Sequence, residues 1–352
     1  MKRIMLAVLI GLALMAGCKD QGASRPSGTN AATQPGEGAS TCQRPGGPVS
    51  GPLKIAVIPK GATHEFWKAI HAGAIKAETE LQDVQIIWKG PLKEDDRTSQ
   101  VNVVEDFIHG GTSGIVLAPL DNVALVRPIR EAAKAGIGVV IIDSDVNADI
   151  CTDYASFVAT ENYIGGCKGA ERLGELLGGK GKVIMLRYHE GSASTMQREQ
   201  GFLDTMKKKF PEVQIISSDQ YGGATADSAM TAAENLLNRF EEVDGIFCPN
   251  ETTTFGMLRA LRQAGLEGEV KFVGFDSGEK LVEALAAGDL HGLVLQDPMS
   301  MGYLGVKTLV AYLRGEAVPS RIDTGCTVAT PENMNDPRIR ALLTPPIGDY
   351  LP

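Results

Sequence analysis

The chain has 352 residues, of which 43% are hydrophobic and 22% are charged, and its formal net charge is −9. This length is enough for two domains, each with a core of its own. The acidic balance argues against a nucleic-acid-binding surface, which needs a basic patch, and it disfavours a strongly anionic ligand.

The first eighteen residues resemble an export signal and are not expected to be part of a fold. Lys2 and Arg3 precede an apolar stretch, 4–14, that is too short to span a bilayer by itself. Small residues then precede Cys18, as in the bacterial lipobox, where cleavage leaves the cysteine as a lipidated N-terminus. We therefore predict lipidation of Cys18. The alternative is a plain signal peptide or short anchor in which this cysteine is incidental.

Residues 19–51 are rich in Gly, Ser, Pro, Thr and Ala and show no apolar periodicity, which predicts a disordered tether. A lipid and a tether together would hold the folded part beside a membrane. The remaining cysteines have no CxxC or zinc-site spacing, and their odd number leaves at least one unpaired within the chain. Their pairing stays open; they are Cys42, Cys151, Cys167, Cys248 and Cys326.

From Leu53 onward, short β-rich runs alternate with helical patterns. Most of the runs are continuously apolar, as expected for strands covered on both faces. The alternation predicts βαβ units and parallel sheets. In the first helical pattern an apolar stripe is formed by Phe66, Ile70, Ala74, Ala77 and Leu81. The predicted strands are 54–59, 84–88, 114–119, 138–143, 156–160, 182–187, 213–217, 245–249, 270–276 and 292–296.

These strands are too many for one comfortable domain, and they fall about equally before and after residue 161, which predicts two similar lobes. The part from Arg321 onward has few helical signals and several prolines. Its run IDTGCTVAT (322–330) is a candidate for one strand that returns to the junction of the lobes.

Open α/β sheets bind ligands beyond the carboxyl ends of their strands. Polar loops and helix caps explain some of the residues there, such as Thr63 and Ser194. They do not explain an Arg, two amides, two acids and an aromatic pair at the same edges of two lobes. Trp67 lies about 100° around the helix from Phe66, off the apolar stripe, which favours a cleft wall. The candidates at these ends are His64, Phe66, Trp67, Asp143, Ser144, Asn162, Arg198, Asn250, Asp276 and Gln296, with Glu161, Glu251 and Asp297 expected at the rim.

Several short motifs stand at the predicted strand ends in a fixed order: FW (66–67), ENYIGG (161–166), REQGF (198–202), PNE (249–251), VGFDS (273–277) and LQDP (295–298). With them, residues 53–329 resemble the periplasmic sugar-binding proteins of the ribose/galactose type, which serve ABC importers. The resemblance implies the periplasmic binding protein-like I fold, an α/β fold of two Rossmann-like lobes with parallel sheets and a three-crossing hinge. The implied lobes are 53–160 with 297–323, and 161–296 with 324–352.

The resemblance also implies roles for the candidates. Phe66 and Trp67 would sandwich a sugar ring, and Tyr221 is a candidate for an aromatic of the second lobe, on an alignment that needs a gap. Ser144 stands where the ribose proteins carry Arg, and His64 stands where they carry Asn, which favours another pentose, a hexose or a polyol. The implied ligands of the hydroxyl groups are Asp143, Asn162, Arg198, Asn250, Asp276 and Gln296.

This chemistry suits a sugar, whose C–H faces pack on aromatic rings and whose hydroxyl groups both donate and accept hydrogen bonds. We expect a monomeric lipoprotein of the periplasm that captures a monosaccharide or polyol and delivers it to an ABC permease. No cofactor, metal or nucleic acid is expected. HEFWK (64–68) begins like a zinc-binding helix, but Lys68 stands where the second His is needed, so no metal pair forms. The same fold serving a receptor kinase or chemoreceptor as a sensor is the alternative. An enzyme using Asp143 and Asp276 as an acid–base pair is disfavoured, because no nucleophile constellation accompanies them.

Overall fold

The computed structural model describes residues 40–352. The predicted signal, Cys18 and the predicted tether up to residue 39 lie outside this range. Within it, no helix is both long enough and apolar enough to cross a membrane.

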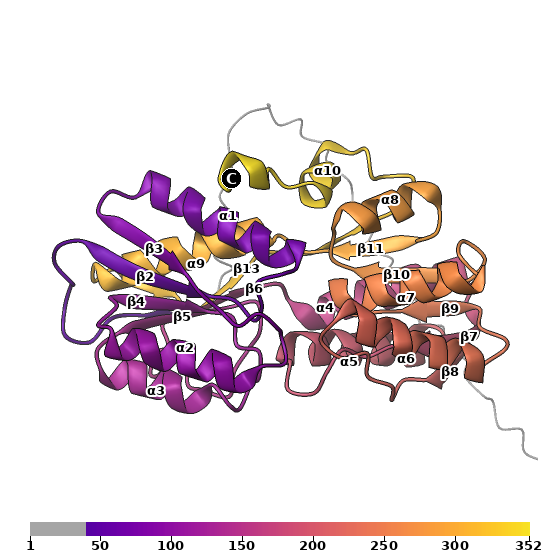
Figure 1. The fold of residues 1–352 in the computed structure, drawn as a ribbon, viewed down its shortest axis with the longest axis horizontal. Coiled ribbons are helices and arrows are strands. Elements are labelled where there is room, and N and C mark those ends of the chain that lie inside the picture. The colour runs from indigo at the N-terminus through magenta and orange to yellow at the C-terminus, as the bar shows by residue number, and fades with distance from the viewer. Residues whose placement is uncertain (1–39) are drawn as a thin grey trace, which may run out of the picture. The chain divides into compact units, whose positions relative to one another are not determined.

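Two six-stranded sheets form the framework (Figure 1). The first has the order β13-β6-β5-β4-β2-β3, and all its neighbouring strands run parallel. The second has the order β14-β11-β10-β9-β7-β8 and is parallel except for β14, which runs antiparallel to β11. Each sheet with its helices is called a lobe below. The predicted fold class is confirmed.

The first sheet consists of β2 (Leu53–Ile58), β3 (Val84–Trp88), β4 (Gly114–Leu117), β5 (Gly138–Ile142), β6 (Ser156–Ala159) and β13 (Arg321–Asp323). The second consists of β7 (Lys180–Met185), β8 (Glu212–Ser217), β9 (Gly245–Phe247), β10 (Lys271–Phe275), β11 (Gly292–Leu295) and β14 (Thr327–Ala329). Each apolar run predicted as a strand overlaps one of these strands, and β2, β7 and β8 begin one or two residues before their predicted runs. The run 322–330 is different from the prediction: it supplies β13 to one sheet and β14 to the other, because the chain crosses between the lobes in its middle.

Helices cover both faces of the first sheet (Figure 1). α1 (Glu65–Glu80) and α9 (Pro298–Leu313) pack on one face, and α2 (Arg97–His109) and α3 (Val126–Lys134) pack on the other. Side chains of a strand alternate between faces, so Ile55 and Val57 of β2 contact the α1–α9 side, whereas Ala56 and Ile58 contact the α2–α3 side. Both faces are therefore buried, which explains the continuous apolar runs.

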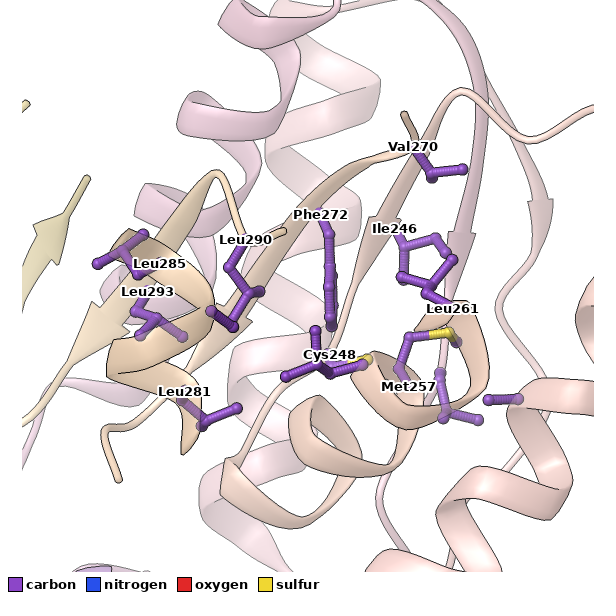
Figure 2. Close-up of a cluster of buried hydrophobic side chains, with 14 of the residues drawn as sticks. Ile246, Cys248, Met257, Leu261, Val270, Phe272, Leu281, Leu285, Leu290 and Leu293 are labelled. Carbon is purple, nitrogen blue, oxygen red and sulfur yellow. The ribbon is translucent and has the colours of Figure 1, made fainter. Parts of the chain in front are cut away.

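The second lobe repeats this arrangement with α4 (Asn162–Leu176) and α5 (Ala193–Lys209) on one face. On the other face lie α6 (Ala226–Arg239), α7 (Glu251–Ala264) and α8 (Glu279–Ala287). Figure 2 shows the core on this face, where Phe272 of β10 lies among Leu290, Met257 and Cys248. The predicted helix stripe is also found: Phe66, Ile70, Ala74 and Ala77 of α1 are buried.

The chain passes between the lobes three times, over residues 160–161, 296–297 and 324–326. Beside the first of these crossings, α4 and α5 pack closely against each other. A Cβ atom on Gly166 of α4 would lie 1.9 Å from the carbonyl oxygen of Arg198 in α5, so only glycine allows this approach. The sequence motif ENYIGG therefore places the backbone of Arg198 against the N-terminal part of α4.

The predicted tether is wrong for residues 40–51. β1 (Thr41–Cys42) pairs with β12 (Val318–Pro319), and Cys42 forms a disulfide with Cys151. The backbone N–H of Val49 also donates to the carbonyl of Leu313 at 2.7 Å. Composition alone predicted disorder because it registers neither a disulfide nor backbone pairing with a distant strand.

The C-terminal segment continues from the second lobe towards the first. α10 (Pro337–Leu343) buries Ile339 and Leu343 in the core of the second lobe. The short 3₁₀ helix η1 (Ile347–Asp349) then contacts α1 of the first lobe. Within 324–352, which the resemblance assigns to the second lobe, η1 thus reaches the first lobe.

Candidate functional site

Side chains from the carboxyl ends of both sheets surround a small cavity of about 30 Å³, space for about two water molecules. Most of the candidates from the sequence line it: His64, Phe66, Trp67, Asp143, Arg198, Asn250, Asp276 and Gln296. The lining residues that sequence reasoning missed, or placed at the rim, are Lys60, Glu94, Tyr188, Ser192, Ser194, Thr195, Glu251 and Thr252.

Asp143 and Asp276 occupy corresponding positions in the two lobes. Asp143 directly follows β5 and Asp276 directly follows β10, and both have left-handed backbone conformations, with φ of 61° and 70°. Asp tolerates this conformation better than most residues, and strained backbone of this kind gathers at functional sites. Both carboxylates are buried, so each needs a partner.

The partners of Asp143 come from both lobes. Lys60 Nζ lies 2.7 Å from Asp143 Oδ2, and Arg198 Nη2 lies 4.0 Å from Asp143 Oδ1. Lys60 also donates to Ser194 Oγ of the second lobe at 3.0 Å. Lys60 ends the first apolar run of the sequence, and a lysine there gives no signal by itself, because lysines commonly follow surface-facing strand ends.

The partners of Asp276 are neutral donors. Gln296 Nε2 donates to Oδ1 at 2.6 Å, and the backbone N–H of Glu251 donates to Oδ2 at 2.9 Å. Burial raises the pKa of Asp276, although the charge of Arg198 opposes this. A hydroxyl donor from a ligand would add to this incomplete set of partners.

Arg198 is held in place by side chains behind the cavity. Its Nε donates to Asn162 Oδ1 at 2.8 Å, its Nη1 donates to the carbonyl of Pro249 at 3.0 Å, and its guanidinium lies 4.1 Å from the ring centroid of Phe275. Among the described residues, its buried Nη2 has no hydrogen-bond partner. Burial lowers the pKa of Arg198, against the charges of Asp276 and Asp143. One edge of the guanidinium is therefore fixed by hydrogen bonds, and Nη2 on the other edge can still donate one.

Glu94 binds three ring side chains that line one side of the cavity. Trp67 Nε1 donates to Glu94 Oε1 at 2.6 Å, His64 Nδ1 lies 2.5 Å from the same oxygen, and the hydroxyl of Tyr188 donates to Oε2. Burial favours the neutral acid, but these contacts outweigh it and lower the pKa of Glu94 to about 2. Phe66 meets Trp67 edge to face, with ring centroids 5.0 Å apart.

His64 is the counter-ion of Glu94. Burial lowers the pKa of His64, but the hydrogen bond to Glu94 and the charges of Glu94, Glu251 and Asp276 outweigh burial and raise it to about 9. Glu251 has the opposite character: burial raises its pKa to about 7 despite the charge of His64. The site thus contains an ionised pair beside a carboxyl group that titrates near neutrality.

Three candidates from the sequence do not line the cavity. Asn162 and Ser144 lie directly behind it: Asn162 accepts from Arg198, and Ser144 Oγ accepts from the backbone N–H of Ser194 at 3.0 Å. Tyr221 lies away from the cavity, because it follows the edge strand β8 and its ring lies 4.8 Å from the guanidinium of Arg187. The aromatic residue that the second lobe contributes is Tyr188, after β7.

Glu94 and Tyr188 had no distinctive sequence signal. Glu94 belongs to the charged run KEDD (93–96), which is typical of a solvated loop, and Tyr188 is one of several polar residues after its strand. Among the described residues, no group of three or more His, Cys, Asp and Glu side chains could hold a metal ion.

Two lobes with parallel sheets and a polar, aromatic-walled cavity between their strand ends define a solute-binding protein. Residues 55–317 match the family described as periplasmic binding protein domain, and the chain belongs to this family. The resemblance to the sugar-binding proteins of ABC importers is confirmed, and the chain is a binding protein and not an enzyme.

Individual relatives agree with this assignment. The D-allose-binding periplasmic protein of Escherichia coli is 31% identical over 272 residues, which cover 76% of this chain and 86% of the relative. An Agrobacterium radiobacter carbohydrate transporter solute-binding protein in complex with D-arabinose is 33% identical, with a TM-score of 0.80 over 83% of this chain and 99% of the other. An Agrobacterium vitis ABC transporter solute-binding protein with bound D-fucose is 35% identical, with a TM-score of 0.80 over 83% and 100%.

Proposed function

We propose that the protein captures a monosaccharide or polyol between its two lobes and delivers it to an ABC importer. The observation that carries the proposal is the convergence of Asp143, Asp276 and Arg198 with the aromatic pair at one cavity. Carboxylates and a guanidinium form short, strong hydrogen bonds with hydroxyl groups, and aromatic rings cover C–H faces. The net charge of −9 agrees with a neutral ligand.

Each lining group has a role in this proposal. Phe66 and Trp67 cover a face of the ring. Asp143, Asp276 and Glu94 accept hydrogen bonds from ligand hydroxyls, and the donors are Lys60, Arg198, Asn250 and Gln296. Ser144 and Asn162 would act indirectly, through Ser194 and Arg198.

Ligand entry requires the lobes to move. The cavity of about 30 Å³ holds only about two waters, because contacts such as Lys60–Asp143 and Tyr188–Glu94 occupy the space. Separation of the lobes about the three crossings would break the Tyr188–Glu94 contact. On closure, sugar hydroxyls would replace some of these partners, which shifts the equilibrium towards the closed form.

The ligand class follows from two observations. His64 and Ser144 stand where the ribose-type pattern has Asn and Arg, so a sugar other than ribose is proposed. The relatives whose names or complexes mention D-allose, D-arabinose, D-fucose and D-tagatopyranose support a monosaccharide. A relative named xylitol-binding protein, 25% identical over 67% of this chain, keeps polyols among the candidates.

The proposal extends to the place and partners of the protein. Lipidation of Cys18 would anchor it in the cell envelope, with the binding lobes in the periplasm as a monomer. The closed form would dock on a membrane permease. Metabolic labelling with a fatty-acid analogue, in the natural chain and in Cys18→Ala, tests the anchor.

The binding function is tested by thermal stabilisation of the purified protein against aldoses, polyols, nucleosides and amino acids. A ligand at 100 times its Kd should add about 2.7 kcal/mol to the free energy of unfolding. Asp143→Asn and Arg198→Ala should abolish the shift, whereas Glu267→Gln, at an exposed residue of the loop after α7, should keep it. A response to nucleosides or amino acids alone would overturn the sugar assignment.

A further inference from the structure

A second cavity, which we call the side chamber, adjoins the candidate site. It measures about 440 Å³ and lies between the first turn of α1, the start of α8 and the C-terminal segment 343–348. Phe66, Asp276 and Gln296 line both the side chamber and the small cavity. These three side chains therefore stand at the boundary between the two spaces.

The walls of the side chamber are mainly apolar. Ala69 and Phe66 of α1 face Val282 of α8, and the C-terminal segment adds Leu343 and Ile347. The charged residues that line it are all acidic, namely Glu65, Asp276, Glu279 and Glu283. Among the described residues no Lys or Arg lines it. Such a surface favours a neutral apolar group and repels a carboxylate or phosphate.

One buried polar atom at the boundary lacks a partner. Gln296 donates through Nε2 to Asp276, but its buried Oε1 accepts no hydrogen bond from any described residue. Buried amide oxygens are normally paired, so this atom indicates a missing donor. A hydroxyl group of a sugar in the candidate site, at its boundary with the side chamber, would supply it.

We infer that the side chamber is a subsite for an apolar aglycone, so that the protein's ligands include alkyl or aryl glycosides whose sugar occupies the candidate site. This inference rests on the proposed function and specifies the substrate class of the same site. The volume of the side chamber is consistent with this role, because cavities for small organic ligands start at about 300 Å³.

The test compares methyl and phenyl glycosides, in both anomers, of D-allose, D-arabinose and D-fucose by calorimetry on the full exported chain. For the sugar that binds, one phenyl anomer should bind at least tenfold more tightly than its methyl counterpart. A 4-carboxyphenyl glycoside should lose this gain, because Glu65, Glu279 and Glu283 line the side chamber. Equal or weaker binding of both phenyl anomers would overturn the inference.

Variants separate the side chamber from the sugar site. Val282→Trp should fill the side chamber and remove the phenyl advantage, by which we mean the tighter binding of the phenyl glycoside than of the methyl glycoside. The methyl glycoside should keep its affinity. Val123→Trp, at an exposed position of the first lobe, is the matched control. Ile347→Ala, which shortens another wall, should reduce the advantage and serves if Val282→Trp does not fold. A phenyl advantage that survives in the folded chamber variant would refute the subsite.

The outcomes also distinguish this inference from the proposed function. Binding of free sugars and methyl glycosides without a phenyl advantage leaves the proposed function standing and removes the subsite. Failure of every sugar and glycoside to bind overturns the proposed function, and the subsite with it.

Discussion

Glu251 of the second lobe caps the helix that begins with Glu65 and Phe66 in the first lobe. Its Oε2 accepts from the backbone N–H of Phe66 at 3.1 Å, and its Oε1 accepts from that of Glu65 at 3.3 Å. The N-cap residue of α1, His64, forms no side-chain capping bond. The first backbone N–H groups of the helix thus find their acceptors across the cleft, in a contact that exists only while the lobes are together.

Glu251→Ala should weaken ligand binding by favouring the open form. Alanine removes both oxygen acceptors, so the backbone N–H groups of Glu65 and Phe66 lose their cap, which is worth about 0.5–2 kcal/mol. The ligand Kd should rise about two- to thirtyfold by calorimetry. Because Glu251 also lines the cavity, X-ray scattering of the unliganded protein should be measured too, and it should show a more open average than the natural chain. An unchanged scattering curve would argue against the cross-lobe cap.

The same residue predicts a pH dependence. Burial raises the pKa of Glu251 to about 7, so the folded protein holds this proton more tightly than the unfolded chain does. Its contribution to stability is therefore fully present below about pH 4.5 and is lost as the pH rises through 7. Urea titrations between pH 5 and 7 give the free energy of unfolding at each pH. Glu251→Gln should remove the part of its fall with rising pH that comes from Glu251. Identical slopes in both proteins would contradict the assigned ionisation.

Glu94 should act in the opposite sense, at acid pH. Burial opposes its charge, but its contacts with His64, Tyr188 and Trp67 lower the pKa to about 2, so its stabilisation is present above about pH 4.5 and is lost as the pH falls through 2. Glu94→Gln removes the counter-ion that keeps the buried His64 protonated, and should cost about 3 kcal/mol at neutral pH. Chemical unfolding measures this loss, with Glu105→Gln, also an ion-paired acid, as the control. If both variants lose the same free energy of unfolding, the contacts of Glu94 contribute no more to stability than an ordinary surface ion pair.

The disulfide between Cys42 and Cys151 should stabilise the first lobe by closing a loop of 109 residues. Cys42→Ser or Cys151→Ser should lower the free energy of unfolding by about 2–5 kcal/mol, and reduction should have the same effect on the natural chain. Cys167→Ser, which removes a thiol that is free in the structure, should change it much less. If reduction destabilises Cys42→Ser as strongly as the natural protein, the assigned pairing is wrong.

The fold was largely predictable because its signals are local. Each strand is predicted from an apolar run of only a few residues. The apolar stripe of α1, which repeats every 3.6 residues, likewise lies within that one helical segment. Asp143 and Asp276 were also predictable, because an acid that directly follows a buried strand must lie at the carboxyl edge of a parallel sheet. Strand position alone places such a residue near the candidate site.

The residues that escaped prediction depend on distant parts of the chain. Lys60 and Glu94 are common residue types in ordinary loop contexts, and only their burial beside Asp143 and Tyr188 distinguishes them. Sequence spacing also does not reveal that β8, the strand before Tyr221, lies at the edge of the sheet and so places Tyr221 away from the cavity. The ordered segment 40–51 depends on a cysteine more than a hundred residues away.

The amino-acid sequence by itself determined the alternation of strands and helices, the two lobes, and the edge of each sheet at which polar residues gather. These properties follow from hydrophobic periodicity and strand direction within short segments. Only the tertiary structure decided that Glu251 caps α1, that Glu94 joins His64, Trp67 and Tyr188, and that Cys42 pairs with Cys151. Each of these contacts joins residues far apart in the chain, and its energy depends on distances of a few ångströms that folding alone establishes.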